Sequence, residues 1–147
     1  MFNSASILDR ETTGLETIHI PDPAAGANLC WNIPEYTNIL PISLSFVLSS
    51  DGTPSNRLVT VAGQRGGIAF CHAPAPAIME ANKIVDYHFA ICVLGVDAYA
   101  TNLYMTGCLS SACVLSYGED LITMVDNLQA GDQISGVYLR YLQKMPR

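Results

Sequence analysis

The amino-acid sequence predicts an all-β fold, an antiparallel β-sandwich or barrel of about eight or more short strands. The first reason is that apolar and polar residues alternate with a period of two along most of the chain. The second is that Gly, Pro, Asp and Asn residues separate these runs at short intervals, as they do in turns between strands. The third is that no stretch has a clear helical pattern, although residues 75–84 are compatible with one helical turn.

The candidate strands in chain order are residues 16–20, 28–33, 40–50, 57–64, 67–73, 83–95, 101–107, 112–116, 120–127 and the closing run that ends at Gln143. Turn residues lie between them, for example Asp51 with Gly52 and Gly131 with Asp132. No repeat and no change in composition divides the chain. We therefore expect one domain over residues 1–147, with residues 1–16 as a candidate extended N-terminal arm.

The alternation also predicts which side chains of the longest strands share a face. In residues 40–50 the apolar face carries Ile42, Leu44, Phe46 and Leu48. In residues 83–95 it carries Val85, Tyr87, Phe89, Ile91 and Val93. In the closing strand Val137, Leu139 and Tyr141 are predicted to face inward, and Tyr138, Arg140 and Leu142 outward.

The composition is unusually poor in charge. Hydrophobic residues make up 50% of the 147 residues and charged residues only 14%. A chain of this length buries roughly two thirds of its unfolded surface and folds without disulfides or metals. So few charges indicate that other subunits, rather than water, cover part of the surface. We therefore expect the protein to form oligomers.

The charge distribution argues against nucleic acid and membranes as direct partners. Seven Lys and Arg residues against thirteen Asp and Glu residues give a formal net charge of −6, and the basic residues do not cluster before the last few positions. A surface that follows DNA needs a basic patch with many phosphate contacts. Residues 1–14 lack the pattern of a secretory signal, and no apolar run approaches the ~20 residues that span a bilayer. We therefore expect a soluble protein made in a cytoplasm.

The cysteines are Cys30, Cys71, Cys92, Cys108 and Cys113, an odd number without a Cys-x-x-Cys pair. This spacing favours buried free thiols in a reducing compartment over a disulfide framework or a metal site. The alternative is a disulfide between Cys108 and Cys113, which would cross-link a hairpin on later oxidation.

The sequence contains no recognisable combination of a nucleophile, a base and an orienting group, so we expect that the protein is not an enzyme. His19, His72 and His88 lie in three different candidate strands without metal-ligand spacing, and the neighbours Cys71 and His72 are expected to point to opposite faces. The Gly-rich stretch at residues 63–67 lacks the Lys and Ser/Thr of a phosphate-binding loop, so a hairpin turn explains it better. We therefore predict no catalytic residue, no metal and no cofactor.

Two segments resemble a family of small structural proteins of tailed-phage virions. In the first, residues 40–63, a strand is followed by a motif that reads Asp51, Asn56, Arg57, Val59 and Val61 here. In the second, residues 120–143, a strand leads into NLQAGDQIS at residues 127–135 and then into the final strand. The two segments make up about a third of the chain, and their positions agree with the strands predicted above.

The resemblance implies a jelly-roll β-sandwich in a phage particle, a capsid cement or decoration protein. Such a protein oligomerises and bridges neighbouring major capsid subunits. Its partners would be itself and the major capsid protein, at the capsid surface of a virion made in the host bacterial cytoplasm. The alternative is a receptor- or carbohydrate-binding module of a tail fibre or spike, in which Trp31, Tyr99 and Tyr104 would stack on sugar rings.

The candidates for structural or interface roles are Asp51, Asn56, Arg57, Gly131, Asp132, Tyr138 and Arg140. Arg57 follows a polar turn and is expected either to pair with a loop carboxylate such as Asp51 or to be a solvated surface arginine. Gly131 is expected to supply the backbone freedom that a tight turn into the last strand requires. Tyr138 and Arg140 mark the outer face of that strand as a candidate contact surface.

Overall fold

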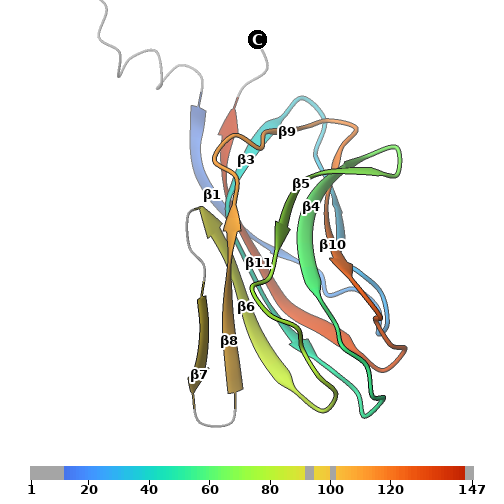
Figure 1. The fold of residues 1–147 in the computed structure, drawn as a ribbon. Helices are drawn as coiled ribbons and strands as arrows, with labels where there is room; N and C mark the ends of the chain where they lie inside the picture. The colour runs from blue at the N-terminus through green and yellow to red at the C-terminus, as the bar shows by residue number, and fades with distance from the viewer. Residues whose placement is uncertain (1–11, 92–94, 100–101, 145–147) are drawn as a thin grey trace, which may run out of the picture.

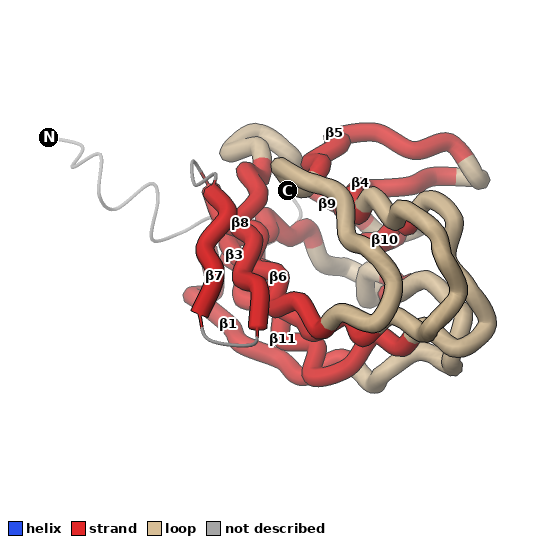
Figure 2. The backbone as a smooth tube through the Cα atoms, turned by 60° about the horizontal axis from the view of Figure 1, so that its bottom comes forward, coloured by secondary structure: helices blue, strands red, loops and turns tan. Residues whose placement is uncertain are grey.

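Two β-sheets pack face to face and enclose the hydrophobic core (Figure 1, Figure 2). The computed structural model describes residues 12–91, 95–99 and 102–144. Within these ranges the chain forms eleven β-strands and no helix, and so no helix that could cross a membrane. The all-β sandwich predicted from the alternation of apolar and polar residues is confirmed.

The larger sheet has seven strands and the smaller sheet has four. The order in the larger sheet is β1 (Thr12–Ile20), β11 (Gln133–Lys144), β3 (Asn38–Ser49), β6 (Ile84–Ile91), β8 (Asn102–Leu109) and β7 (Gly95–Tyr99), and β9 (Leu115–Ser116) also pairs with β3. The order in the smaller sheet is β2 (Cys30–Asn32), β10 (Asp120–Val125), β4 (Val59–Arg65) and β5 (Ile68–Pro74).

The strand order is that of a jelly roll. When β7, β8 and β9 are set aside as an insertion, the larger sheet reads β1-β11-β3-β6 and the smaller sheet reads β2-β10-β4-β5. The last strand, β11, therefore lies between the first and the third and pairs with both. This central position explains why the closing run of the sequence alternates so regularly, because one face of β11 is buried along much of its length.

One pairing departs from the predicted antiparallel arrangement. Strands β6 and β8 run parallel, with Val85 opposite Leu103 and Ile91 opposite Leu109. Strand β7 is antiparallel to β8 and lies at the edge of the sheet, so β8 is placed between β6 and β7. Of the strand predicted at residues 83–95, β6 covers Ile84–Ile91 and residues 92–94 lie outside the described residues, while Gly95 belongs to β7, an element that the sequence did not reveal.

The apolar faces predicted for the long strands form the centre of the core. The buried residues on three neighbouring strands are Leu44, Phe46, Leu48, Val85, Tyr87, Phe89, Val137 and Leu139. The rings of Phe46, Tyr87 and Phe89 stack with centroids 5.4, 6.1 and 6.2 Å apart. Burial of a large apolar side chain contributes about 1.5–3 kcal/mol, so this layer supplies much of the stability.

Two β-bulges decide which residues of β3 and β11 face the core. In β3 the bulge adds Ile42 as an extra residue. The side chains that face the core are therefore Leu44 and, beyond the bulge, Pro41 and Ile39. Ile42 is only half-buried, and its predicted place on the same face as Leu44 is wrong. In β11 the bulge contains Gly136, whose φ of 60° lies in the left-handed region that favours glycine.

Three further expectations concern residues 75–84, the N-terminal arm and Val93. Residues 75–84 do not form a helical turn, because Met79 exchanges two backbone hydrogen bonds of 2.8 Å with Arg57 and so forms an isolated β-bridge. Of the candidate N-terminal arm, residues 12–16 belong to β1, and the remainder lies outside the described residues. Val93, expected on the buried face of its strand, also lies outside them.

Candidate functional site

Arg57 is the centre of a buried ion cluster at one end of the sandwich. Its side chain is 0% exposed, and it stands just before β4. Its Nε donates to Oδ2 of Asp132 at 2.8 Å, and its Nη2 donates to Oδ1 of the same carboxylate at 2.9 Å. The same Nη2 also donates to Oδ1 of Asp51 at 2.9 Å. We call Asp51, Arg57 and Asp132 the Arg57 cluster.

The hydrogen-bonding capacity of the guanidinium is fully used. Its Nη1 donates to the backbone oxygens of Ser55 at 2.8 Å and Thr53 at 3.3 Å, so each of the N–H groups of an arginine has an acceptor here. The carboxylate of Asp132 also accepts the backbone N–H groups of Gln129 at 2.8 Å and Asp51 at 2.9 Å. A buried charge is stable only when it is paired and hydrogen-bonded in this way.

The surroundings shift the pKa values of both members of the bidentate pair. Burial alone would raise the pKa of Asp132, but the Arg57 guanidinium and the backbone N–H groups of Gln129 and Asp51 lower it below its ordinary value. The hydrogen bond to Asp132 raises the pKa of Arg57 further above its already high value, against the opposing effect of burial. Both groups are therefore charged at neutral pH.

The Arg57 cluster joins loops that lead to both sheets. Asp51 lies in the β3–β4 loop and Asp132 in the β10–β11 loop. The backbone of Arg57 bonds to Met79 in the β5–β6 loop, and the backbone oxygen of Asp132 accepts the N–H of Gly26 in the β1–β2 loop at 2.8 Å. These loops gather at the lower end of the ribbon in Figure 1. We call this end of the sandwich the tied end.

The structure decides between the two readings of Arg57. Arg57 pairs with Asp51, as the sequence suggested, and it is not a solvated surface arginine. The sequence also marks Asp132 as a site candidate, but 75 residues separate it from Arg57. Local spacing carries no information about such a distant partner, so the bidentate pair was not predicted.

Asn56 and Gly131 lie beside the cluster. The side chain of Asn56 is exposed and lines an open hollow of about 440 Å³, while its backbone oxygen accepts Nδ2 of Asn127 at 3.0 Å. Gly131 does not have a positive φ, so the predicted reason for a glycine there is wrong. A Cβ atom at this position would lie 2.7 Å from Oδ2 and 2.9 Å from Cβ of Asp51. The glycine is needed because Asp51 packs directly against the backbone.

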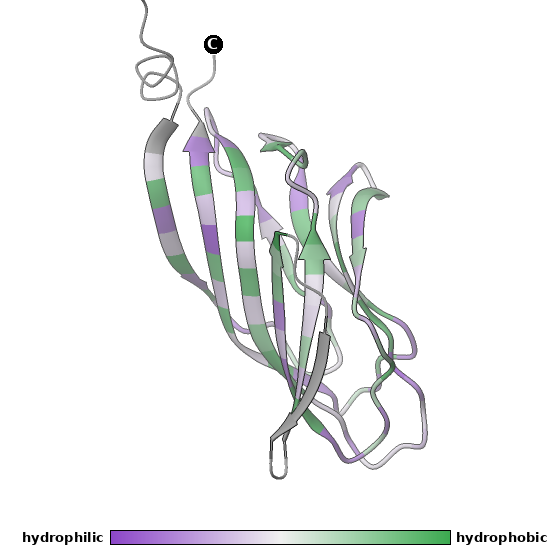
Figure 3. Cartoon of the chain, turned by 60° about the vertical axis from the view of Figure 1, so that its left-hand side comes forward, coloured by the Kyte–Doolittle hydropathy of each residue, from purple (hydrophilic) through white to green (hydrophobic). Residues whose placement is uncertain are grey.

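Tyr138 and Arg140 lie apart from the Arg57 cluster, on the outer face of the larger sheet. Both side chains are exposed, and the ring of Tyr138 lies 5.0 Å from that of His19 on β1. Arg140 stands between Thr17 of β1 and Ser43 of β3 in the sheet register. Figure 3 shows the alternating hydropathy along these strands. The predicted inward face of the closing strand is confirmed for Val137, Leu139 and Tyr141, which lie in or against the core. The predicted outward face is confirmed for Tyr138 and Arg140, whereas Leu142 is half-buried.

A second polar link was not predicted. Thr123 of β10 is buried on the strand face that also carries Leu121 and Val125. Its Oγ1 accepts the backbone N–H of Leu29 at 2.8 Å, and Oδ1 of Asn28 accepts the N–H of Val125 at 3.0 Å. These bonds fix the β1–β2 loop on β10. The signal in the sequence is a threonine at a position where the period of two requires an apolar residue.

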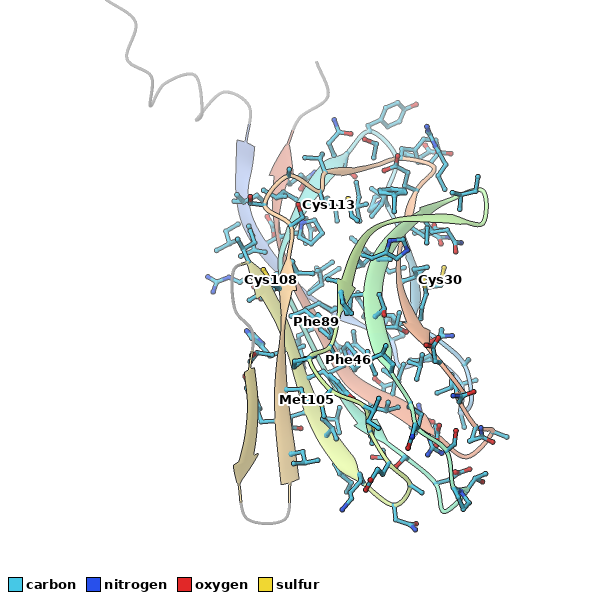
Figure 4. The ribbon with its side chains drawn as sticks, viewed as in Figure 1. Cys30, Phe46, Phe89, Met105, Cys108 and Cys113 are labelled. Carbon is cyan, nitrogen blue, oxygen red and sulfur yellow. The ribbon has the colours of Figure 1, made fainter. Side chains whose placement is uncertain are left out.

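The cysteines differ from the prediction in their exposure. Cys30 and Cys71 are exposed, because β2 and β5 are the edge strands of the smaller sheet, so the prediction of buried thiols is wrong for them. Cys108 and Cys113 are half-buried, and Cys92 lies outside the described residues. Cys108 lies on the outer face of β8 opposite Ala90, whereas Cys113 packs against the core (Figure 4). The structure therefore shows no disulfide between them, and a bond that forms on later oxidation stays a prediction.

The polar groups of the Arg57 cluster hold loops of the chain together. Its charges are paired and its N–H donors are used by groups of the chain itself. Within the described residues, no group of three or more His, Cys, Asp and Glu side chains is placed to hold a metal ion. Comparison of the chain with protein-family models, with curated proteins and with solved structures finds no match.

Proposed function

We propose that this protein is a structural component of a tailed-phage virion, a capsid cement or decoration protein that oligomerises and bridges neighbouring major capsid subunits. The observation that carries the proposal is that the two segments resembling such proteins meet in the Arg57 cluster. Arg57 belongs to the first segment and Asp132 to the second, and their side chains are 2.8 Å apart. Ser55 Oγ and the Asn56 backbone oxygen of the first segment also bond to Asn127 of the second. The residues that define the resemblance thus form one structural unit.

The rigidity of the tied end supports this proposal. A protein that holds neighbouring subunits in place must keep its own loops in one arrangement while it is bound. Loops that are already ordered lose little conformational freedom on association, which favours tight binding. The Arg57 cluster supplies that order through short bonds between segments distant in the sequence.

The outer face of the larger sheet is the surface that we assign to the subunit contacts. Its outward residues around the middle of the sheet are mostly small or uncharged: Thr17, His19, Ser43, Ser45, Ala90 and Cys108. Tyr138, 51% exposed, and Arg140 stand among them. The centres of protein interfaces are poor in charge and rich in Tyr and Arg, so this composition supports a contact surface.

The direct test measures assembly. The purified chain is examined by light scattering for its oligomeric state and is then added to expanded capsids that lack it. We expect a defined oligomer and saturable binding to the capsid. A protein that remains monomeric and does not bind such capsids would contradict the proposal.

Two arginine variants locate the contact surface. Arg140→Ala is expected to weaken capsid binding at least about tenfold, while the free energy of unfolding changes by no more than about 0.5 kcal/mol, because the side chain is exposed. Arg65→Ala is the matched control, since Arg65 is also exposed but lies at the end of β4 in the other sheet. Equal binding of the two variants would rule out the outer face at Arg140 as the contact surface.

One observation favours the alternative of a carbohydrate-binding module. A hollow of about 240 Å³ lies on the same outer face, and its walls include His88 and Tyr104. Trp31 is less suited to a sugar, because its ring packs 5.9 Å from that of Tyr141. The side chain of Tyr99 lies outside the described residues. Glycan binding that is lost in Tyr104→Ala and kept in Arg140→Ala would favour this alternative over the capsid role.

A further inference from the structure

Cys71 and Cys113 come from opposite sides of the sandwich but line the same narrow space. Cys71 is in β5 of the smaller sheet, and Cys113 is in the loop between β8 and β9, which both pair within the larger sheet. The space that they share has a volume of about 10 Å³ and is walled largely by apolar residues, among them Leu109 and Leu121. A cavity of this size holds at most about one water molecule. The two cysteines therefore lie across a nearly filled gap.

The backbone at Cys71 has an unusual conformation. Its φ is 53°, in the left-handed region that residues other than glycine rarely adopt. The pairing of β5 with β4 shifts by one residue here, between the partners of Val61 and Gly63, which is the pattern of a β-bulge. Such bulges change the direction in which a side chain of an edge strand points. Cys71 is exposed to solvent and at the same time reaches the space next to Cys113.

The environment of Cys113 contains the thiol of Cys71. The pKa of Cys113 is raised to about 12, first by burial and then by a hydrogen bond and the charge of Cys71, with a smaller effect of Glu119. Cys113 is half-buried, whereas Cys71 is exposed. The two thiols are therefore neighbours that differ in their access to reagents in solution.

We propose that Cys71 and Cys113 are a redox pair that forms an intramolecular disulfide in the folded protein when it meets a low-molecular-weight disulfide such as oxidised glutathione. The bond would join β5 of the smaller sheet to the β8–β9 loop of the larger sheet. This inference concerns the chain alone and does not depend on the role in a virion.

The reaction is balanced by thiol–disulfide exchange in two steps. The Cys71 thiolate attacks one sulfur of oxidised glutathione, and the other glutathione leaves as a thiolate that takes up the proton lost by Cys71. The Cys113 thiol then loses its proton as it attacks the Cys71 sulfur of this mixed disulfide, and the second glutathione leaves as a thiolate that takes up that proton. The two cysteines are oxidised by two electrons, and oxidised glutathione is reduced to two glutathione thiols.

The test maps disulfides in the folded full-length chain after incubation with oxidised glutathione at pH 8. The sample is quenched with acid, alkylated, digested without reductant and analysed by mass spectrometry. We expect a linked pair of peptides that contain Cys71 and Cys113, with a mass lower by two hydrogens. The link should persist in Cys108→Ser and be lost in both Cys71→Ser and Cys113→Ser. A link between Cys113 and Cys108, or a final product with glutathione still bound to Cys71, would overturn the proposal.

The same reaction in concentrated urea shows whether the fold selects the pair. In the unfolded chain a short loop closes more easily than a long one, so the Cys108–Cys113 link is expected to exceed the Cys71–Cys113 link. The folded protein should reverse this ratio by at least about tenfold, because the fold places Cys108 and Cys113 on different faces. The same ratio in both states would contradict a pair selected by the fold.

Discussion

The two ends of the sandwich are held in different ways. At the tied end, Arg57 is fully buried and its N–H groups bind carboxylates and backbone oxygens of neighbouring loops. The opposite end, which we call the open end, consists of the β2–β3 and β4–β5 turns and the segment from β8 to β10. It exposes Tyr36, Ile68 and Tyr117, which are 82%, 75% and 57% accessible.

The difference shows where the loops of this fold obtain their order. Loops at the tied end are fixed by buried polar bonds, so a single substitution there affects several segments. Loops at the open end place apolar side chains in water and have contacts such as the exposed bond from the Tyr117 hydroxyl to Oε1 of Glu35 at 3.2 Å. We therefore expect substitutions at the two ends to have very unequal effects on stability.

The largest effect is expected for Arg57→Ala at the tied end. Removal of the guanidinium leaves the buried Asp132 and its neighbour Asp51 without a counter-charge, and breaking a buried pair in this way costs about 3–5 kcal/mol. Urea unfolding at pH 7 measures the loss. Arg65→Ala at the open end is the control and should change the free energy of unfolding by less than about 0.5 kcal/mol. A loss below about 1 kcal/mol in Arg57→Ala would mean that the cluster is not what mainly holds the loops of the tied end together.

The next effect depends on pH and tests the charge of Asp132. The pKa of Asp132 is lower in the folded than in the unfolded protein. Its contribution to the free energy of unfolding is therefore complete above the unfolded pKa of about 3.9 and is lost as the pH falls through the folded pKa. Asp132→Asn should reduce the free energy of unfolding by about 2–3 kcal/mol at pH 7. The difference from the unsubstituted protein should shrink steadily between pH 5 and pH 2, the interval about and below the unfolded pKa. A difference that is constant over this range would show that charge is not the cause.

Substitution by alanine is expected to lower stability by different amounts at two glycines, one at each end, and this difference is smaller than the effects above. Gly131→Ala forces a Cβ atom against Asp51 and should cost about 2–3 kcal/mol by overpacking. Gly66 in the β4–β5 turn has a φ of 56°, and a Cβ atom added to it would have no neighbouring atom within 4 Å. Gly66→Ala should therefore cost only about 1 kcal/mol, through its backbone conformation.

Asparagine variants separate the two causes. Asn tolerates a positive φ better than Ala does, so Gly66→Asn should be more stable than Gly66→Ala. At Gly131 the larger side chain increases the collision, so Gly131→Asn should be less stable than Gly131→Ala. The opposite order at either position in urea unfolding would show that the assigned cause is wrong there.

The smallest effect is expected for Tyr117→Phe at the open end. The substitution removes only the exposed hydrogen bond to Glu35, so thermal unfolding should change by less than about 0.5 kcal/mol. A loss above about 1 kcal/mol would show that polar bonds also fix the loops of the open end, so that the two ends would not differ in this respect.

The regular parts of the fold were predictable because they depend on local alternation. The period of two placed Leu44, Leu48 and Leu139 on the buried side, since one face of each of these strands meets the other sheet. The prediction failed at Ile42, where a bulge adds one residue and exchanges the faces. A bulge arises from the pairing with a distant strand, so the period of one strand alone does not reveal it.

The site was predictable only where its members are close in the sequence. Arg57 and Asp51 belong to one turn, and their pairing followed from that proximity. The bond from Arg57 to Asp132 depends on how the jelly roll brings two remote loops to one end, and the packing of Gly131 against Asp51 has the same origin. The exposure of Cys71 likewise depends on β5 being an edge strand, a property of the sheet order rather than of the residue.

The pairing of β1 with β11 has a practical consequence for engineering. Thr12 lies directly across from Lys144, and both strands reach the open end at these residues. A segment attached before Thr12 or after Lys144 therefore leaves the described fold on the same side, away from the Arg57 cluster. The same proximity suits circular permutation, in which a peptide joins the two strands and new termini are cut between Gly66 and Gly67, a turn with open space around both residues. Such a permutant keeps every strand pairing of the jelly roll and moves its free ends to the β4–β5 hairpin.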